Sequence, residues 1–243
     1  MKKILVPSLI ALAVSALASV AQAQTAPAEP ESTLSYNVGA VSDYRYRGIS
    51  QSRLQPALQG GVDYADKSGF YVGAWGSTIK WIKDAGGDAN VELDLYGGYK
   101  GTAGDVAYDV GFLRYQYPSN NLSVSANTNE VYGAVTYGLF TAKYSHAVSN
   151  LFGFGDSKNS YYLDLSANFD LGSGYTLTPH VGRQSVKNTS SASYNDVALT
   201  LAKDLGDGLS ATAAVIDTTT DAYVYDGKNL GKTSVVLGLK YAF

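Results

Sequence analysis

Apolar and polar residues alternate with a period of two along most of this chain. In the last segment, "SVVLGLKYAF", every second residue from Val235 to Phe243 is apolar or aromatic, and Lys240 lies between two of them. The same alternation recurs over residues 91–99, 106–112, 161–169 and 197–201. The pattern predicts antiparallel β-strands, each with one apolar face, rather than helices.

Two kinds of connection alternate between these segments. Five short connections are rich in Gly and Asp, which suit the positive φ of hairpin turns, and they recur about every 35 residues: 66–69, 101–105, 138–140, 170–174 and 204–208. Six longer polar segments lie between them: 43–54, 77–89, 118–128, 150–159, 185–193 and 218–231. Each repeat thus holds two strands, with tight turns at one end and loops at the other.

Two soluble all-β folds would also alternate. A β-sandwich would have shorter strands, and a propeller would repeat every ~40–50 residues with four strands per blade. A closed barrel removes the edge strands that nothing else in this chain would cover. We therefore expect an antiparallel up-and-down transmembrane β-barrel of about 12 strands over residues 33–243.

The N-terminus has the features of a cleaved signal peptide. The basic start "MKK" precedes an apolar run over residues 4–20, and "AQA" at 21–23 is a small-x-small cleavage sequence. A transmembrane anchor is the alternative, but the run is short and contains Pro7. We expect a signal peptide over 1–23 and a flexible leader over 24–32.

The composition agrees with an exported membrane barrel and excludes other classes. The chain has 20 Tyr against 7 Phe, and Tyr suits boundaries between water and lipid. Its excess of acidic residues argues against nucleic-acid binding, and the absence of Cys excludes disulfides. A mean hydropathy of −0.08 does not exclude a membrane protein, because only every second residue of a barrel strand must be apolar.

Two parts of the chain resemble known outer-membrane proteins. The terminal Phe243, with Leu237, Leu239 and Tyr241 at alternate positions before it, resembles the membrane-assembly signal of bacterial outer-membrane barrels. The segments "SDYRYRGISQSRLQPALQGGVDY" and "SGFYVGAWGS" resemble the opening of the TorF family of proposed porins, also known as Gcw_chp, most specifically at residues 42–51 and 56–61. The resemblance implies an outer-membrane barrel of a Gram-negative bacterium that acts as a porin. The partners expected for it are outer-membrane lipids, the barrel-assembly machinery and small solutes or ions.

The stretch "SDYRYRGISQ" extends the first predicted strand. Read with a period of two, Tyr44 and Tyr46 face lipid as girdle residues, whereas Arg45 and Arg47 point inward, about 7 Å apart. An Arg on the lipid face would cost about 2–4 kcal/mol near the midplane. The alternative is that residues 43–48 form an exposed loop with their charges in water.

The same alternation predicts which charged residues line the pore. Eight acidic and four basic residues have inward parity: Asp43, Asp63, Glu92, Asp94, Asp109, Glu130, Asp164 and Asp196, with Arg45, Arg47, Lys143 and Lys240. The acidic excess predicts a modest cation preference. Twelve strands lie between filled eight-stranded barrels and open ones of 16–18 strands, so a narrow pore and a barrel plugged by paired charges both remain open.

The sequence contains no pattern that indicates catalysis, a cofactor or a metal site. His180 has inward parity and His146 outward parity near the lipid interface, but no G-x-S-x-G elbow accompanies them. The acidic stretch "DAGGDANVELD" lacks the EF-hand spacing, and Trp75 and Trp81 suggest interface anchoring. We therefore expect a porin-like channel and not an enzyme. The alternatives are a structural or adhesive barrel that binds a partner through its loops, and a lipid-modifying enzyme.

Overall fold

A computed structural model describes residues 32–243 of the chain. The predicted signal peptide and the predicted leader up to residue 31 lie outside the described residues, and Ser32 is already the first residue of a strand. Among residues 32–243, no helix is long and apolar enough to cross a membrane.

Twelve antiparallel strands close into one barrel, which confirms the predicted fold. The element β10 and the short β11 both pair with β12 and form two halves of one barrel strand, interrupted at Asn168. The barrel elements are β1 (Ser32–Val41), β4 (Ala57–Asp66), β5 (Phe70–Thr78), β6 (Val91–Ala103), β7 (Val106–Gln116), β8 (Thr128–Tyr137), β9 (Phe140–Ala147), β10 (Tyr161–Ala167), β11 (Phe169–Gly172), β12 (Tyr175–Ser185), β13 (Tyr194–Gly206), β14 (Leu209–Thr218) and β17 (Ser234–Ala242).

The first and last strands close the barrel. β1 pairs with β17, and Gly39 lies opposite Lys240 in the ladder. On its other side β1 pairs with β4, and each later barrel strand pairs with its neighbours along the chain. Closure therefore pairs both ends of the sheet and leaves no free edge.

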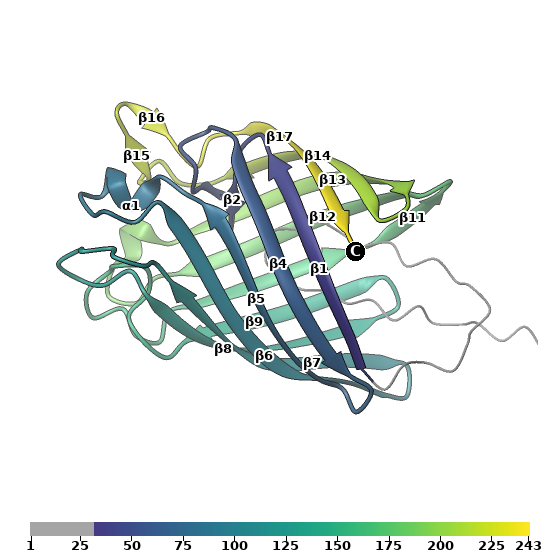
Figure 1. Ribbon diagram of the computed structural model, residues 1–243. Coiled ribbons are helices and arrows are strands. Elements are labelled where there is room, and N and C mark those ends of the chain that lie inside the picture. Colours follow the sequence, from purple (N-terminus) through teal and green to yellow (C-terminus); the bar gives the residue numbers. More distant parts are fainter. Residues whose placement is uncertain (1–31) are drawn as a thin grey trace, which may run out of the picture.

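The connections confirm the predicted alternation of turns and loops. Short turns join the strands at the end where the C-terminus lies (Figure 1). Six loops lie at the other end, and we name them L1 (42–56), L2 (79–90), L3 (117–127), L4 (148–160), L5 (186–193) and L6 (219–233). They contain the short elements β2 (Arg45–Tyr46), β3 (Ile49–Ser50), α1 (Trp81–Asp84), η1 (Ser190–Ala192), β15 (Val224–Tyr225) and β16 (Lys228–Asn229).

The apolar face of the strands points outward, as the alternation predicts. Val235, Leu237 and Leu239 of β17 are 66%, 57% and 55% exposed, whereas Val236 between them is buried. Leu163 and Leu165 of β10 are exposed in the same way. The exterior is therefore an apolar surface suited to lipid.

Inside the barrel, tyrosine rings lie over glycines of neighbouring strands. A Cβ added to Gly73 would lie 2.5 Å from Tyr96 Cζ, and one added to Gly111 would lie 2.5 Å from the Tyr132 hydroxyl. A Cβ on Gly98 would likewise lie 2.6 Å from the hydroxyl of Tyr71. The missing side chain of each glycine thus leaves the space that a large ring occupies, which gives a physical reason for much Gly and Tyr in one chain.

Candidate functional site

Loop L1 folds into the lumen at the loop end of the barrel. β1 ends at Val41, and β2 and β3 then form a small hairpin in which Arg45 pairs with Ser50. The turn of this hairpin is Arg47-Gly48, with φ of 48° and 80°, as the mirror-image turns of hairpins require. Both sequence-based alternatives for this stretch are wrong, because it is neither a continuation of the first strand nor an exposed loop.

Asp43 and Arg45 stabilise the base of L1. Arg45 Nε lies 2.5 Å from Asp43 Oδ2, and Ser50 Oγ donates to Asp43 Oδ1 at 2.5 Å. Arg45 also donates to the carbonyl of Leu230 at 2.9 Å and to Ser234 Oγ at 2.7 Å. These bonds attach the loop to L6 and to the last strand of the barrel.

The two tyrosines of L1 lie inside the barrel, so their predicted place in a lipid-facing girdle is wrong. Tyr44 is 1% exposed, its hydroxyl donates to Glu92 Oε1 at 2.6 Å, and its ring packs on Trp75 with 5.6 Å between centroids. The hydroxyl of Tyr46 is hydrogen-bonded to that of Tyr115. Trp75 is buried at the same place, and the interface anchoring predicted for it is also wrong. The alternation of β1 does not continue to Tyr44 and Tyr46, because the hairpin in L1 turns the chain inward after Val41.

Arg47 lies at the tip of the hairpin and contacts three different barrel strands. Its Nη2 lies 2.8 Å from Glu130 Oε2 on β8, and its Nη1 donates to Gln184 Oε1 on β12 at 2.7 Å. The guanidinium carbon also lies 4.8 Å from the ring centroid of Tyr46 and 4.4 Å from that of Tyr162 on β10. We name these four partners, Glu130, Gln184, Tyr46 and Tyr162, the Arg47 cradle.

L1 thereby crosses the lumen. A Cβ on Gly48 would lie 2.5 Å from Thr218 Cγ2 on β14 and 2.8 Å from Asp196 Cβ on β13, so the hairpin tip packs tightly against that wall. Tyr44 contacts β5 and β6 on another side, through Trp75 and Glu92. The loop therefore narrows the loop end of any passage through the barrel.

Several predicted pore-lining acids lie beneath L1 and are almost completely shielded. Glu92, Asp94, Glu130 and Asp196 are each 3% exposed or less. Both carboxylate oxygens of Asp94 and Oε1 of Glu130 are buried with no hydrogen-bond partner among the described residues. The alternation predicts that these four side chains face the lumen, but it does not indicate that a loop covers them.

His180 lies between two carboxylates that it was not predicted to meet. Its Nδ1 is 3.2 Å from Asp164 Oδ2 and its Nε2 is 2.8 Å from Asp196 Oδ2. Tyr162 donates to Asp196 Oδ1 at 2.9 Å. A ring with a carboxylate at each nitrogen fits an imidazolium that donates on both sides. No pattern near His180 in the sequence predicts these contacts, because they depend on how the strands pair. In that pairing, Gly182 lies opposite both Asp164 and Asp196.

The remaining predicted residues lie nearer the turn end of the lumen. Tyr96 donates to Asp63 at 2.5 Å, Tyr71 donates to Asp109 at 2.6 Å, and Lys143 Nζ lies 4.1 Å from the ring centroid of Tyr132. Lys240 is partly buried on β17, opposite Gly39 of β1. Lys100, whose Nζ is 4.0 Å from Asp109 Oδ2, was missed, although continuing the alternation from Asp94 would have placed it on the same face.

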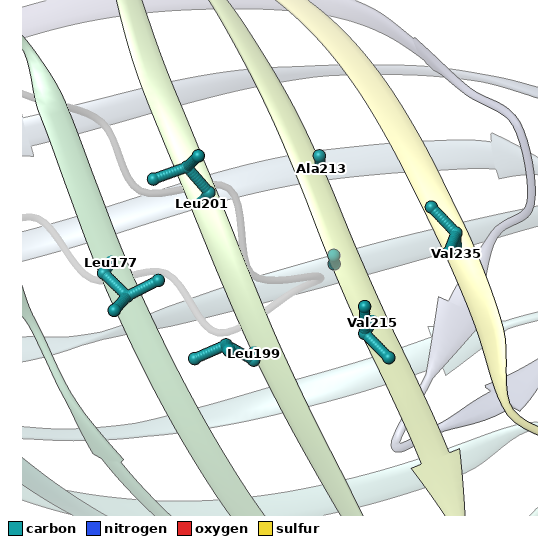
Figure 2. Close-up of a pocket in the computed structure, with 7 residues that line it drawn as sticks. Leu177, Leu199, Leu201, Ala213, Val215 and Val235 are labelled. Carbon is teal, nitrogen blue, oxygen red and sulfur yellow. The ribbon is translucent and has the colours of Figure 1, made fainter.

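The apolar hollow on the outer surface does not belong to this site, and no metal site was found among the described residues. An apolar hollow lined by Leu199, Val215 and Val235, among others, lies over β12, β13, β14 and β17, and these three side chains are exposed on the outer surface (Figure 2). It faces away from the lumen. Among residues 32–243, no three His, Cys, Asp or Glu side chains are arranged to hold a metal ion.

Comparisons with known proteins identify the family of this chain and solved structures with a similar fold. The family model described as "Bacterial protein of unknown function (Gcw_chp)" matches residues 24–243, which confirms the Gcw_chp resemblance; the name TorF is not part of that description. No sequence among the curated proteins matches the chain.

Among solved structures, the fold resembles a "KdgM porin in complex with disordered oligogalacturonate", with a TM-score of 0.54 and 9% identity. It also resembles a NanC porin, with a TM-score of 0.54 and 12% identity. Each alignment covers 87% of this chain and 99% of the porin. At these identities the likeness establishes the fold and leaves the solute open.

Proposed function

The chain belongs to the Gcw_chp family of bacterial proteins, and we propose that it is an outer-membrane, porin-like channel for passive passage of small solutes or ions, with a modest cation preference. The observation that carries this proposal is the division of the barrel into an apolar exterior and an interior of charged and hydroxyl-bearing side chains. A barrel built only as a scaffold would gain more from an apolar interior, because buried ionised groups are costly.

The preference for cations is inferred from the balance of charge beneath L1. Arg47 is paired with Glu130, and Arg45 is paired with Asp43. Glu92 accepts a hydrogen bond from Tyr44, and Asp94 has no partner among the described residues. Glu92 and Asp94 thus lie beneath L1 with no basic partner in the ion pairs of the described residues. In their ionised form, these two groups would set a field that favours positive ions.

The same geometry argues against an enzyme. Both ring nitrogens of His180 are occupied by aspartates, so neither is available to take a proton from a serine. We therefore propose no catalytic residue, and we place lipids and the barrel-assembly machinery as partners only in the sense that any outer-membrane barrel needs them.

Conductance of the purified protein in planar lipid bilayers tests the proposal. We expect discrete openings in KCl and a reversal potential under a KCl gradient whose sign shows K⁺ passing more readily than Cl⁻. The absence of conductance, in both the wild type and a variant with L1 removed, would contradict the channel and favour the adhesive alternative. A Cl⁻-selective reversal potential would contradict only the cation preference.

A further inference from the structure

The Arg47 cradle has the features of a built guanidinium site. Two acceptors, Glu130 Oε2 and Gln184 Oε1, lie 2.8 and 2.7 Å from the two terminal nitrogens of the same side chain. Two tyrosine rings lie beside the guanidinium carbon, at 4.8 and 4.4 Å. Glu130 and Gln184 are 1% and 3% exposed, so these acceptors are shielded from bulk water. A planar cation with forked donors fits this arrangement better than a compact ammonium does.

The backbone indicates that the Arg47 side chain is held there at a conformational cost. Arg47 has φ of 48°, in the left-handed region that disfavours residues with a Cβ. The mirror-image hairpin turn at this position favours Asn, Asp or Gly. A strained arginine at the hairpin tip is therefore better explained by the contacts of its guanidinium than by the needs of the turn.

The surroundings of the cradle hold more hydrogen-bond acceptors than Arg47 uses. Oε1 of Glu130 and both oxygens of Asp94 are buried without a hydrogen-bond partner among the described residues. Asp94 lies opposite Tyr115 in the sheet, and the hydroxyl of Tyr115 donates to Glu130 Oε2 at 3.3 Å. These unpartnered acceptors beside the cradle favour a ligand with several N–H donors, as a guanidinium group has.

We propose that Arg47 acts as a tethered ligand, and that solutes bearing a guanidinium group compete with it for the cradle and release the tip of L1. This inference rests on the proposed channel function, since it names the solute class that the channel would select. A short tether gives Arg47 an effective concentration on the order of millimolar, so a free guanidinium solute competes at similar concentrations.

Removing the tethered ligand tests the inference directly. We expect the Arg47→Ala variant to conduct more than the wild type in planar bilayers, because its cradle is empty. Methylguanidinium chloride, titrated from about 0.1 to 10 mM around the millimolar range of short flexible tethers, should then lower the conductance of Arg47→Ala severalfold, because it binds in the empty cradle with no tethered competitor. Methylammonium chloride at equal ionic strength should have little effect.

The Arg47→Ala/Glu130→Gln variant should lose the response to methylguanidinium. Arg183→Ala is the matched control, because Arg183 is an exposed residue of β12 whose side chain bonds Asn195 outside the lumen.

Binding measured without conduction separates this inference from the channel proposal. Isothermal titration calorimetry of detergent-solubilised Arg47→Ala should detect methylguanidinium binding that Glu130→Gln removes, with far-UV circular dichroism verifying that each variant is folded. Binding in the absence of any conductance would support the cradle and overturn the channel. Conductance in the absence of binding and block would overturn the cradle and leave the channel standing. Equal binding of methylammonium would overturn the selectivity for guanidinium.

Discussion

Replacing Gly73 by Ala tests whether tyrosine rings and glycines are matched across the strands. A Cβ at Gly73 would lie 2.5 Å from Tyr96 Cζ and 2.6 Å from Asp63 Oδ1. The ring of Tyr96 must therefore move, and its hydrogen bond to Asp63, now 2.5 Å long, is strained or lost. Overpacking a filled site costs about 1–3 kcal/mol, and loss of a hydrogen bond to a carboxylate costs about 1.5–3 kcal/mol. We expect Gly73→Ala to lower the free energy of unfolding by about 2.5–6 kcal/mol.

Gly133→Ala is the matched control on the outer surface. The only heavy atom near a Cβ at Gly133 is Val110 Cγ1 at 4.0 Å, which is an ordinary contact. Since Ala loses less conformational entropy than Gly within a strand, this change should leave stability unchanged or raise it by up to about 1 kcal/mol. Urea unfolding of the refolded barrel in lipid vesicles, followed by tryptophan fluorescence, measures both changes.

A double variant isolates the clash. Tyr96→Ala is destabilising by itself, but it removes the ring that the new methyl group of Gly73→Ala meets. Gly73→Ala should therefore cost much less in the Tyr96→Ala background than in the wild type. The reasoning is refuted if Gly73→Ala and Gly133→Ala have equal effects, or if the cost of Gly73→Ala is the same in both backgrounds.

Three further predictions follow from L1 and from the two faces of the strands. Arg45→Ala should raise single-channel conductance, because it removes the bonds from L1 to L6 and β17; bilayer recording with an unchanged conductance would contradict this. Glu92→Gln combined with Asp94→Asn should move the reversal potential under a KCl gradient toward zero, and an unaltered potential would show that other groups set the selectivity. A spin label at position 163, in place of exposed Leu163, should be more accessible to oxygen than to a water-soluble nickel reagent, and a label in place of Asp164 should show the opposite order. Equal accessibility at the two positions would contradict a lipid-facing wall.

The wall of the barrel could be predicted from the sequence because its environment imposes a simple rule. Lipid outside and polar groups inside require opposite character at successive residues, as Leu163 and Asp164 show. The short turns could be located for a related reason, since their positive φ values favour Gly, Asn and Asp. These signals are local, and each requires only a few neighbouring residues to be compared.

The site could be predicted only in part, because its contacts join distant segments. Parity assigned Glu130 and Asp196 to the interior, but nothing near Arg47 in the sequence indicates that it meets Glu130, 83 residues away. The same limit applies to His180 and its two aspartates. The tyrosines of L1 do not follow the alternation, because the ladder of β1 ends at Val41. The Arg47-Gly48 turn was a signal that this strand could not continue.

The bonds of Arg45 also have a consequence for the order of assembly. They join a loop near the beginning of the described chain to residues 185 and 189 positions later, in L6 and at the start of β17. Those partners come into place only when the last strand has met the first. L1 therefore takes its final place inside the lumen only at the end of folding. Until the last strand has paired with the first, these bonds do not hold L1 across the lumen.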